Sequence, residues 1–122
     1  MFETKEEFRD FLKNSNKEIT IIKFTASWCG PCAKIHPLIM ELINHYKDKE
    51  QHYRFIEIDV DKCKEIYAFF KKRRMVSGIP AFCLYYKSKF DEETFYVPHK
   101  TVIGANPQQI IQLFSSSLDK LP

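Results

Sequence analysis

The sequence predicts an α/β fold built on a mixed sheet of four main strands with helices on both faces. Apolar, β-branched runs alternate with amphipathic segments in the order α-β-α-β-α-β-β-α. Helices between the first three strands indicate crossover connections and a parallel pairing of the first two, whereas the last two are close enough for an antiparallel hairpin. The 122 residues, 44% of them apolar, suffice for one domain, residues 1–122, and are too few for two.

The first half of the chain is expected to contain two helices and one central strand. Thr4 and Glu7 form a capping box that starts a helix with an apolar face. The run 19–24 is β-branched and apolar almost throughout, which is typical of a strand covered on both faces. A helical pattern follows from Pro31. Because only residues 1–3 precede the first helix, we expect any strand before it to be very short or absent.

The second half is expected to supply the other strands and helices. The expected elements are a strand at 53–60, a helix from Cys63 into the basic turn Lys71–Arg74, a strand at 81–86, a polar loop at 87–94, a strand-like segment at 95–103 and a last helix from Pro107. Pro98 interrupts the strand-like segment and demotes part of it to an edge or a bulge. Asn106 is placed as the N-cap of the last helix.

Two of the four cysteines, Cys29 and Cys32, fall where the central strand passes into the next helix. The thiolate is the nucleophile of disulfide exchange, and the free N–H groups of a helix N-terminus stabilise negative charge. Cys29 would occupy that end. Cys32, one turn in, would be more buried and close enough to attack a mixed disulfide. Gly30 and Pro31 suit a tight turn that opens a helix.

Two other uses of the cysteines remain open. Cys63 and Cys83 are available as further zinc ligands, but they are not the closely spaced pair that structural zinc sites use. A structural disulfide is the other alternative, although a chain without an export signal is expected in a reducing compartment. We expect Cys63 and Cys83 to be buried, unreactive thiols.

The motif Ser27-Trp28-Cys29-Gly30-Pro31-Cys32 resembles the active-site signature of the thioredoxin family. Three further matches follow in the family's order: Pro37, the segment 78–82 and the segment 102–106. The resemblance covers nearly the whole chain. It implies the thioredoxin fold, no cofactor and no metal, and a protein disulfide oxidoreductase with roles in electron transport and cell redox homeostasis.

By this resemblance Cys29 attacks the disulfide of a partner protein and Cys32 resolves the mixed disulfide. A thioredoxin reductase then reduces the oxidised pair. The family implies active-site support from Trp28, Gly30 and Pro31, and substrate binding by Trp28, Ile79, Pro80 and Gly104. A cis Ile79–Pro80 bond is expected to bring the Ile79 backbone beside Cys29, where it pairs with an extended substrate segment.

Lys23, six residues before Cys29, departs from the family, which usually carries a buried aspartate there to assist proton transfer. A buried lysine is unfavourable unless it is paired or deprotonated. Glu57 occupies a position where many family members carry lysine. One interpretation is a swapped ion pair in which Glu57 supplies the carboxylate near Cys32. In the other, Lys23 extends to the surface and Glu57 is solvated.

Other functions use the same features. The Gly-Pro dipeptide favours disulfide reduction, but an oxidase or isomerase would use the same chemistry, and a binding module would dock through Lys71–Arg74. The hairpin 87–101 is longer than the family's tight turn, and it has no assigned function.

The net charge of +3 is too small to imply a nucleic-acid partner, and no apolar run approaches the ~20 residues of a membrane span. We therefore expect a cytoplasmic monomer with protein partners.

Overall fold

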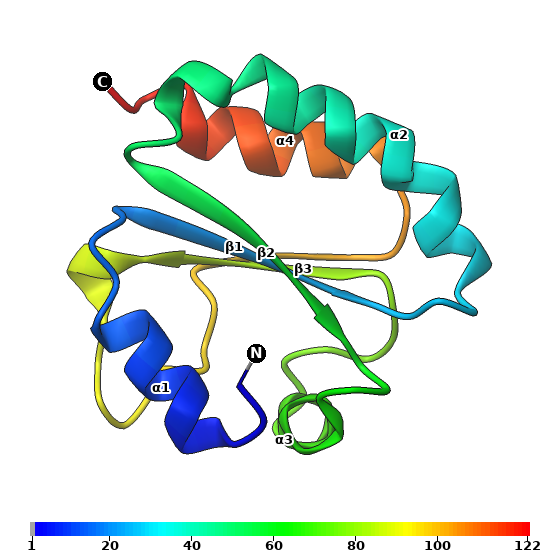
Figure 1. The fold of residues 1–122 in the computed structure, drawn as a ribbon, viewed down its shortest axis with the longest axis vertical. Helices are drawn as coiled ribbons and strands as arrows, with labels where there is room; N and C mark the ends of the chain where they lie inside the picture. Colours follow the sequence, from blue (N-terminus) through cyan, green and yellow to red (C-terminus); the bar gives the residue numbers. More distant parts are fainter. Residues whose placement is uncertain (1) are drawn as a thin grey trace.

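A four-stranded sheet with the order β2-β1-β3-β4 runs through the middle of the molecule and separates two layers of helices (Figure 1). The strands are β1 (Ile19–Thr25), β2 (Tyr53–Asp59), β3 (Ala81–Tyr86) and β4 (Lys100–Ile103). β1 pairs in parallel with β2 and antiparallel with β3, and β3 pairs antiparallel with β4. The computed structural model describes residues 2–122, and over these residues the predicted mixed sheet is confirmed.

Two helices cover each face of the sheet. One face carries α1 (Lys5–Lys13) and α3 (Lys64–Lys72), and the other carries α2 (Gly30–His45) and α4 (Pro107–Leu118) (Figure 1). Residues 2–4 contain no strand, and Met1, part of the predicted short first segment, lies outside the described residues. None of the helices within 2–122 is long and apolar enough to cross a bilayer.

β1 is the centre of the hydrophobic core because its side chains alternate between the two faces. Ile22 and Phe24 belong to the apolar cluster that also contains residues of α1 and α3. Ile19 and Ile21 belong to the cluster that contains residues of α2 and α4. By this alternation Lys23 lies on the same face as Ile21, in an otherwise apolar layer.

α1 begins at the predicted capping box. Thr4 Oγ1 accepts the Glu7 N–H at 3.1 Å, and Glu7 Oε1 accepts the Thr4 N–H at 3.0 Å. These bonds satisfy backbone donors that the start of a helix leaves unpaired. Phe8 is fully buried and makes edge-to-face contacts with the rings of Phe2 and Phe70, so α1 is held against α3.

α3 runs into the basic cluster, as the sequence predicts, and ends at Lys72, where the chain turns. The Arg74 N–H donates to the Lys71 carbonyl at 3.0 Å, and the Met75 N–H donates to the Phe70 carbonyl at 2.9 Å. These two bonds form a Schellman motif, whose turning residue adopts a left-handed conformation. Arg74 has φ +61°, a conformation that glycine usually occupies at such positions.

Only residues 100–103 of the strand-like segment 95–103 pair with β3. Pro98 has no N–H to donate to a neighbouring strand. Just before it the chain turns, and the Val97 N–H donates to the Thr94 carbonyl at 3.0 Å. The prediction of a strand from residue 95 is therefore wrong for its first half.

Replacing Arg74 with glycine is expected to stabilise the protein by about 0.5–1 kcal/mol, because glycine adopts a positive φ without the clash of a Cβ atom. The midpoint of urea unfolding measures this change. Arg74→Ala is the matched control, since it removes the same charge and keeps the Cβ atom. Equal stability of the glycine and alanine variants would contradict the prediction.

Candidate active site

Cys29 is the N-cap of α2, and Cys32 lies in the first turn of that helix. The Cys29 Sγ atom accepts the Cys32 N–H at 3.1 Å. The two Cα atoms are 5.3 Å apart, and the side chains are bonded as a disulfide. Gly30 and Pro31 occupy the positions between them, where the missing N–H of proline leaves no helical bond unmade.

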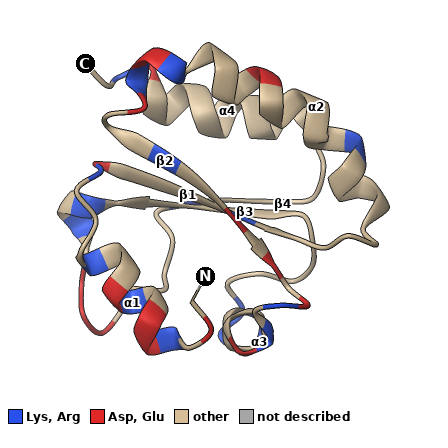
Figure 2. Ribbon diagram, viewed as in Figure 1, with Lys and Arg blue, Asp and Glu red and all other residues tan. Residues whose placement is uncertain are grey.

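The chain segment that contains the pair carries no charged side chains of its own. Residues 25–33 contain no Lys, Arg, Asp or Glu, and the corresponding loop is uncharged in Figure 2. Cys29 and Cys32 are both buried in this oxidised form, with exposed fractions of 5% and 3%. The expected difference in burial is therefore small. The main difference between the two cysteines is that the sulfur of Cys29 accepts a hydrogen bond from a backbone N–H of α2.

Trp28 projects from the site, with 67% of its surface exposed. Its indole Nε1–H donates to Asp61 Oδ2 at 2.8 Å. Sequence analysis did not identify Asp61 as a site residue. The parallel pairing of the first two strands could have identified Asp61. β1 and β2 end at the same edge of the sheet, and Asp61 follows β2 just as Trp28 follows β1.

The Ile79–Pro80 bond is cis, as the family resemblance implies. The Gly104 N–H donates to the Pro80 carbonyl at 2.8 Å, and Gly104 has φ +102°. Ile79 packs against the apolar cluster that contains Cys29 and Cys32. The fold thus gathers the cysteine pair, the cis-proline segment and the end of β4 in one region.

A shallow apolar hollow adjoins the first turn of α2. Its lining comes from the start of α2 and from the loop that leads into α4, namely Gly30, Pro31, Lys34, Ile35, Leu38, Ala105 and Pro107. The hollow therefore offers apolar surface beside the disulfide.

Lys23 and Glu57 form an ion pair, with 3.4 Å between Lys23 Nζ and Glu57 Oε2. They are register partners on the parallel strands β1 and β2, so their side chains leave the sheet on the same face. The Lys23 side chain is only 2% exposed, whereas that of Glu57 is 41% exposed. The lysine therefore does not reach the surface by itself, and its charge is compensated by a carboxylate that faces water.

Cys63 and Cys83 are buried free thiols. Burial raises the pKa of Cys63, and it raises the pKa of Cys83 to about 12. Within residues 2–122 no group of three or more His, Cys, Asp or Glu side chains is arranged to hold a metal ion. The described residues therefore give no support to the alternative of a zinc site.

Comparisons with known proteins point to one family. The thioredoxin family model matches residues 1–115. Thioredoxin of Mus musculus is 33% identical over 89 residues, which cover 73% of this chain and 77% of the mouse protein. The structure of Plasmodium falciparum thioredoxin is 26% identical with a TM-score of 0.68, over 95% of this chain and 96% of that one. Oxidised mitochondrial thioredoxin 3 of Saccharomyces cerevisiae is 30% identical with a TM-score of 0.68, over 94% and 92%.

The ion pair predicts unequal effects of its two single substitutions. Glu57→Gln is expected to destabilise the protein by about 1–3 kcal/mol, because it leaves the buried Lys23 ammonium without its counter-charge. Lys23→Met removes the buried charge, keeps the length of the side chain and is expected to be nearly neutral. In the Lys23→Met background, where no buried charge remains, the Glu57→Gln substitution should change the free energy of unfolding very little. Urea unfolding of all four proteins measures the cycle, and additive effects would contradict the ion pair.

The raised thiol pKa values predict selective alkylation of the reduced protein. At pH 8 the folded chain should react with iodoacetamide at the CxxC pair, while Cys63 and Cys83 stay unmodified, because a raised pKa lowers the thiolate fraction at that pH. Mass spectrometry of tryptic peptides locates the label. The same reaction in urea should modify all four cysteines, and rapid labelling of Cys63 in the folded protein would contradict the prediction.

Proposed function

This chain belongs to the thioredoxin family, and we propose that Cys29 is its attacking thiolate and Cys32 its resolving thiol. The protein is a thiol–disulfide oxidoreductase that reduces protein disulfides. One observation supports this assignment of roles above all. Cys29 Sγ lies at the N-terminus of α2 and accepts a backbone N–H there, so the helix favours the charged form of this sulfur.

The proposed reaction is two successive thiol–disulfide exchanges. The Cys29 thiolate attacks one sulfur of the substrate disulfide, which forms a mixed disulfide and releases the first substrate sulfur as a thiolate. Cys32 loses its proton and attacks Cys29 Sγ, which releases the second substrate sulfur. The substrate gains two electrons and takes up two protons, and the pair ends as the disulfide seen in the structure.

In the second exchange Glu57 is proposed to accept the proton of Cys32, directly or through water. Two observations support this role. The carboxylate is held on the α2 face of the sheet by the buried Lys23 ammonium, and 41% of its side chain remains exposed to solvent. It is therefore both positioned and able to exchange its proton with water. Lys23 is a positioning residue in this proposal.

Substrate is proposed to bind across the surface formed by Trp28, the Ile79–Pro80 segment and Gly104. Trp28 supplies an exposed apolar face whose orientation is fixed by Asp61. The Ile79 backbone is proposed to pair with an extended substrate segment, in the manner of strand addition. The apolar hollow beside Pro31 extends this surface along α2.

The reductant of the oxidised pair is proposed to be a thioredoxin reductase, and the protein is proposed to act as a monomer. The proposed compartment is the cytoplasm. Two buried free thiols support a reducing environment in general. A mitochondrial thioredoxin of Saccharomyces cerevisiae is among the structural relatives, so localisation of the tagged chain in cells is the deciding measurement.

A docking function for the basic turn Lys71–Arg74 has less support than catalysis. The Arg73 guanidinium lies 5.3 Å from the ring centroids of Phe69 and of Tyr96, and it donates to the Tyr96 hydroxyl at 3.3 Å. Arg73 is therefore engaged in contacts within the molecule. These contacts give Arg73 a role within the molecule that requires no binding partner.

Turnover of a protein disulfide tests the two cysteine roles. With a thioredoxin reductase as electron source, insulin reduction should be abolished by Cys29→Ser, because the attacking sulfur is missing. Cys32→Ser should accumulate a mixed disulfide between Cys29 and the substrate, visible on a non-reducing gel and reversed by dithiothreitol. Trapping by Cys29→Ser instead would reverse the proposed roles.

Stopped-flow kinetics tests the proposed proton acceptor. Glu57→Gln should slow resolution of the mixed disulfide by about 10-fold or more, the scale of general base catalysis, while its formation is unchanged. The Lys23→Met/Glu57→Gln protein is the control for stability, since it lacks the unpaired ammonium and should still resolve slowly. Normal resolution in either variant would contradict the role of Glu57.

A further inference from the structure

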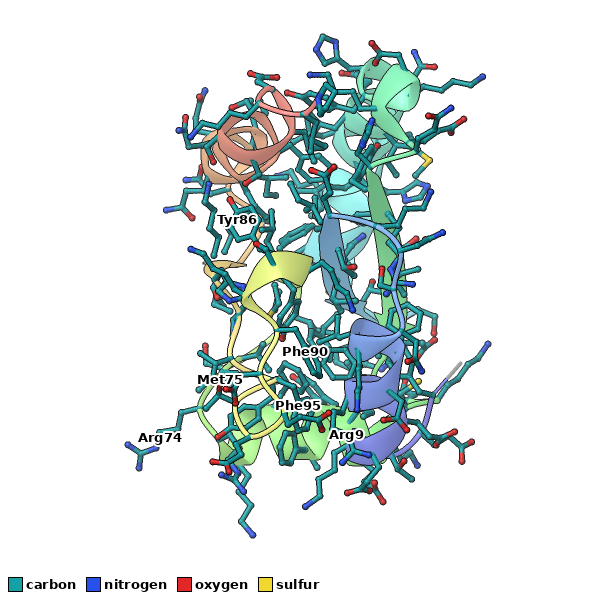
Figure 3. All side chains as sticks on the ribbon, turned by 90° about the vertical axis from the view of Figure 1, so that its left-hand side faces the viewer. Arg9, Arg74, Met75, Tyr86, Phe90 and Phe95 are labelled. Carbon is teal, nitrogen blue, oxygen red and sulfur yellow. A yellow bond between two sulfur atoms is a disulfide. The ribbon has the colours of Figure 1, made fainter. Side chains whose placement is uncertain are left out.

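A cavity of about 280 Å³ lies at the end of the sheet opposite the disulfide. Its lining includes Thr20 at the start of β1 and Tyr85 and Tyr86 at the end of β3, whereas Cys29 follows the far end of β1. Figure 3 views the molecule from the side of this cavity and labels Tyr86, Phe90 and Phe95. The cavity is therefore separate from the proposed catalytic surface.

The long connection between β3 and β4, residues 87–99, forms the outer wall of this cavity. Phe90 and Phe95 project from it toward α1 (Figure 3) and pack against the apolar core cluster. The Tyr85 hydroxyl donates to the Tyr96 carbonyl at 2.8 Å, which fastens the middle of the connection to β3. The connection, α1 and the ends of β1 and β3 thus surround a partly open pocket.

The interior of the cavity is apolar and aromatic. Its walls are formed by Leu12 of α1, Tyr85 of β3, and Phe90, Phe95 and Val97 of the connection. Such a wall favours an apolar ligand body, and aromatic side chains favour a ring in offset or edge-to-face contact.

The rim of the cavity carries more positive than negative charge. Lys17, Lys87 and Lys89 line it, against one acid, Asp91. Asp91 Oδ1 already accepts the backbone N–H groups of Glu93 and Thr94. The rim therefore offers mainly donors to a ligand.

The three rim lysines differ in whether their ammonium groups already have a hydrogen-bond acceptor. Lys17 Nζ donates to the Glu50 carbonyl at 2.9 Å, and Lys87 Nζ donates to the Lys13 carbonyl. Among the described residues Lys89 Nζ has no hydrogen-bond acceptor, and it lies 5.3 Å from the centroid of the Tyr86 ring.

His99 adds a neutral donor to the same rim. Its Nδ1 accepts the Tyr86 N–H at 3.2 Å, so the proton of the neutral ring is on Nε2. Burial, with a contribution from Lys89, lowers the pKa of His99 and keeps the ring neutral at pH 7. The rim therefore combines one cation that lacks a hydrogen-bond acceptor among the described residues with one N–H donor.

We propose that this cavity binds a small aromatic carboxylate, with its ring among Phe90, Phe95 and Leu12 and its carboxylate at Lys89 and His99. The volume lies just below the roughly 300–1,000 Å³ of pockets for drug-sized ligands, which suits a single ring with a short acidic chain and excludes a nucleotide. The rim of cations and donors selects an anion over a neutral or cationic analogue.

Titration of the ¹⁵N-labelled oxidised protein with 3-phenylpropionate, followed by amide chemical shifts, tests the proposal. The shifts should concentrate in residues 12–20 and 85–99 and leave 28–32 unchanged. The matched ligands 3-phenylpropan-1-ol and 3-phenylpropylamine have the same ring without the negative charge, and hexanoate has the charge without the ring. Each should bind at least about five-fold more weakly.

Two variants test separately how the charge of Lys89 and the space in the cavity contribute to binding. Lys89→Gln should weaken the binding of 3-phenylpropionate about five-fold and leave the affinity for the alcohol unchanged. Lys72→Gln on α3 is the matched control and should change neither affinity. Val97→Trp, at a residue that is 40% exposed, should fill the cavity and abolish binding in a protein whose spectrum remains dispersed.

Three results would overturn the proposal. One is the absence of shifts at these residues up to about 10 mM 3-phenylpropionate. Another is equal affinity for the carboxylate and either the alcohol or hexanoate. The third is unchanged affinity in Lys89→Gln. Because the readout is binding to the oxidised protein, these results do not depend on the disulfide chemistry of Cys29 and Cys32.

Discussion

The position of β1 is the constraint on which the rest of the structure depends. It is hydrogen-bonded to β2 along one edge and to β3 along the other, and both of its faces are covered by helices. A strand in this position has no freedom of register, because a shift of one residue would exchange its two apolar faces. Its carboxyl end therefore delivers Trp28 and Cys29 to a fixed place, beside the end of β2 that supplies Asp61.

The same constraint explains why a lysine is tolerated in the strand. Lys23 is surrounded by apolar residues of β1 and is nearly inaccessible to water. The parallel register places Glu57 directly beside it, so the carboxylate compensates the ammonium without a helix or loop having to move. The pair is asymmetric, since the anion remains at the surface and keeps much of its hydration. An asymmetric pair loses less solvation than one in which both ions are buried.

Local signals in the sequence were sufficient for much of the fold and for the position of the cysteine pair at the start of a helix. The capping box at Thr4, the strand-to-helix junction at Cys29 and the Asn106-Pro107 helix start each depend on residues a few positions apart. Features that depend on distant residues were harder to predict. The contact between Trp28 and Asp61 requires the pairing of two strands, and the course of 95–99 is decided by Pro98 and by its packing on α1. Tertiary contacts of this kind override local strand propensity.

Cys29 caps α2, and in the proposed function it is also the attacking sulfur, two roles that are usually performed by different residues. A negatively charged sulfur accepts the Cys32 N–H more strongly than the neutral sulfur of a disulfide does. Helix stability and redox state are therefore linked in a thermodynamic cycle. Whatever free energy the cap adds to α2 in the thiolate form also shifts the equilibrium toward the dithiol, and lengthening or breaking the first turn of α2 would change both together.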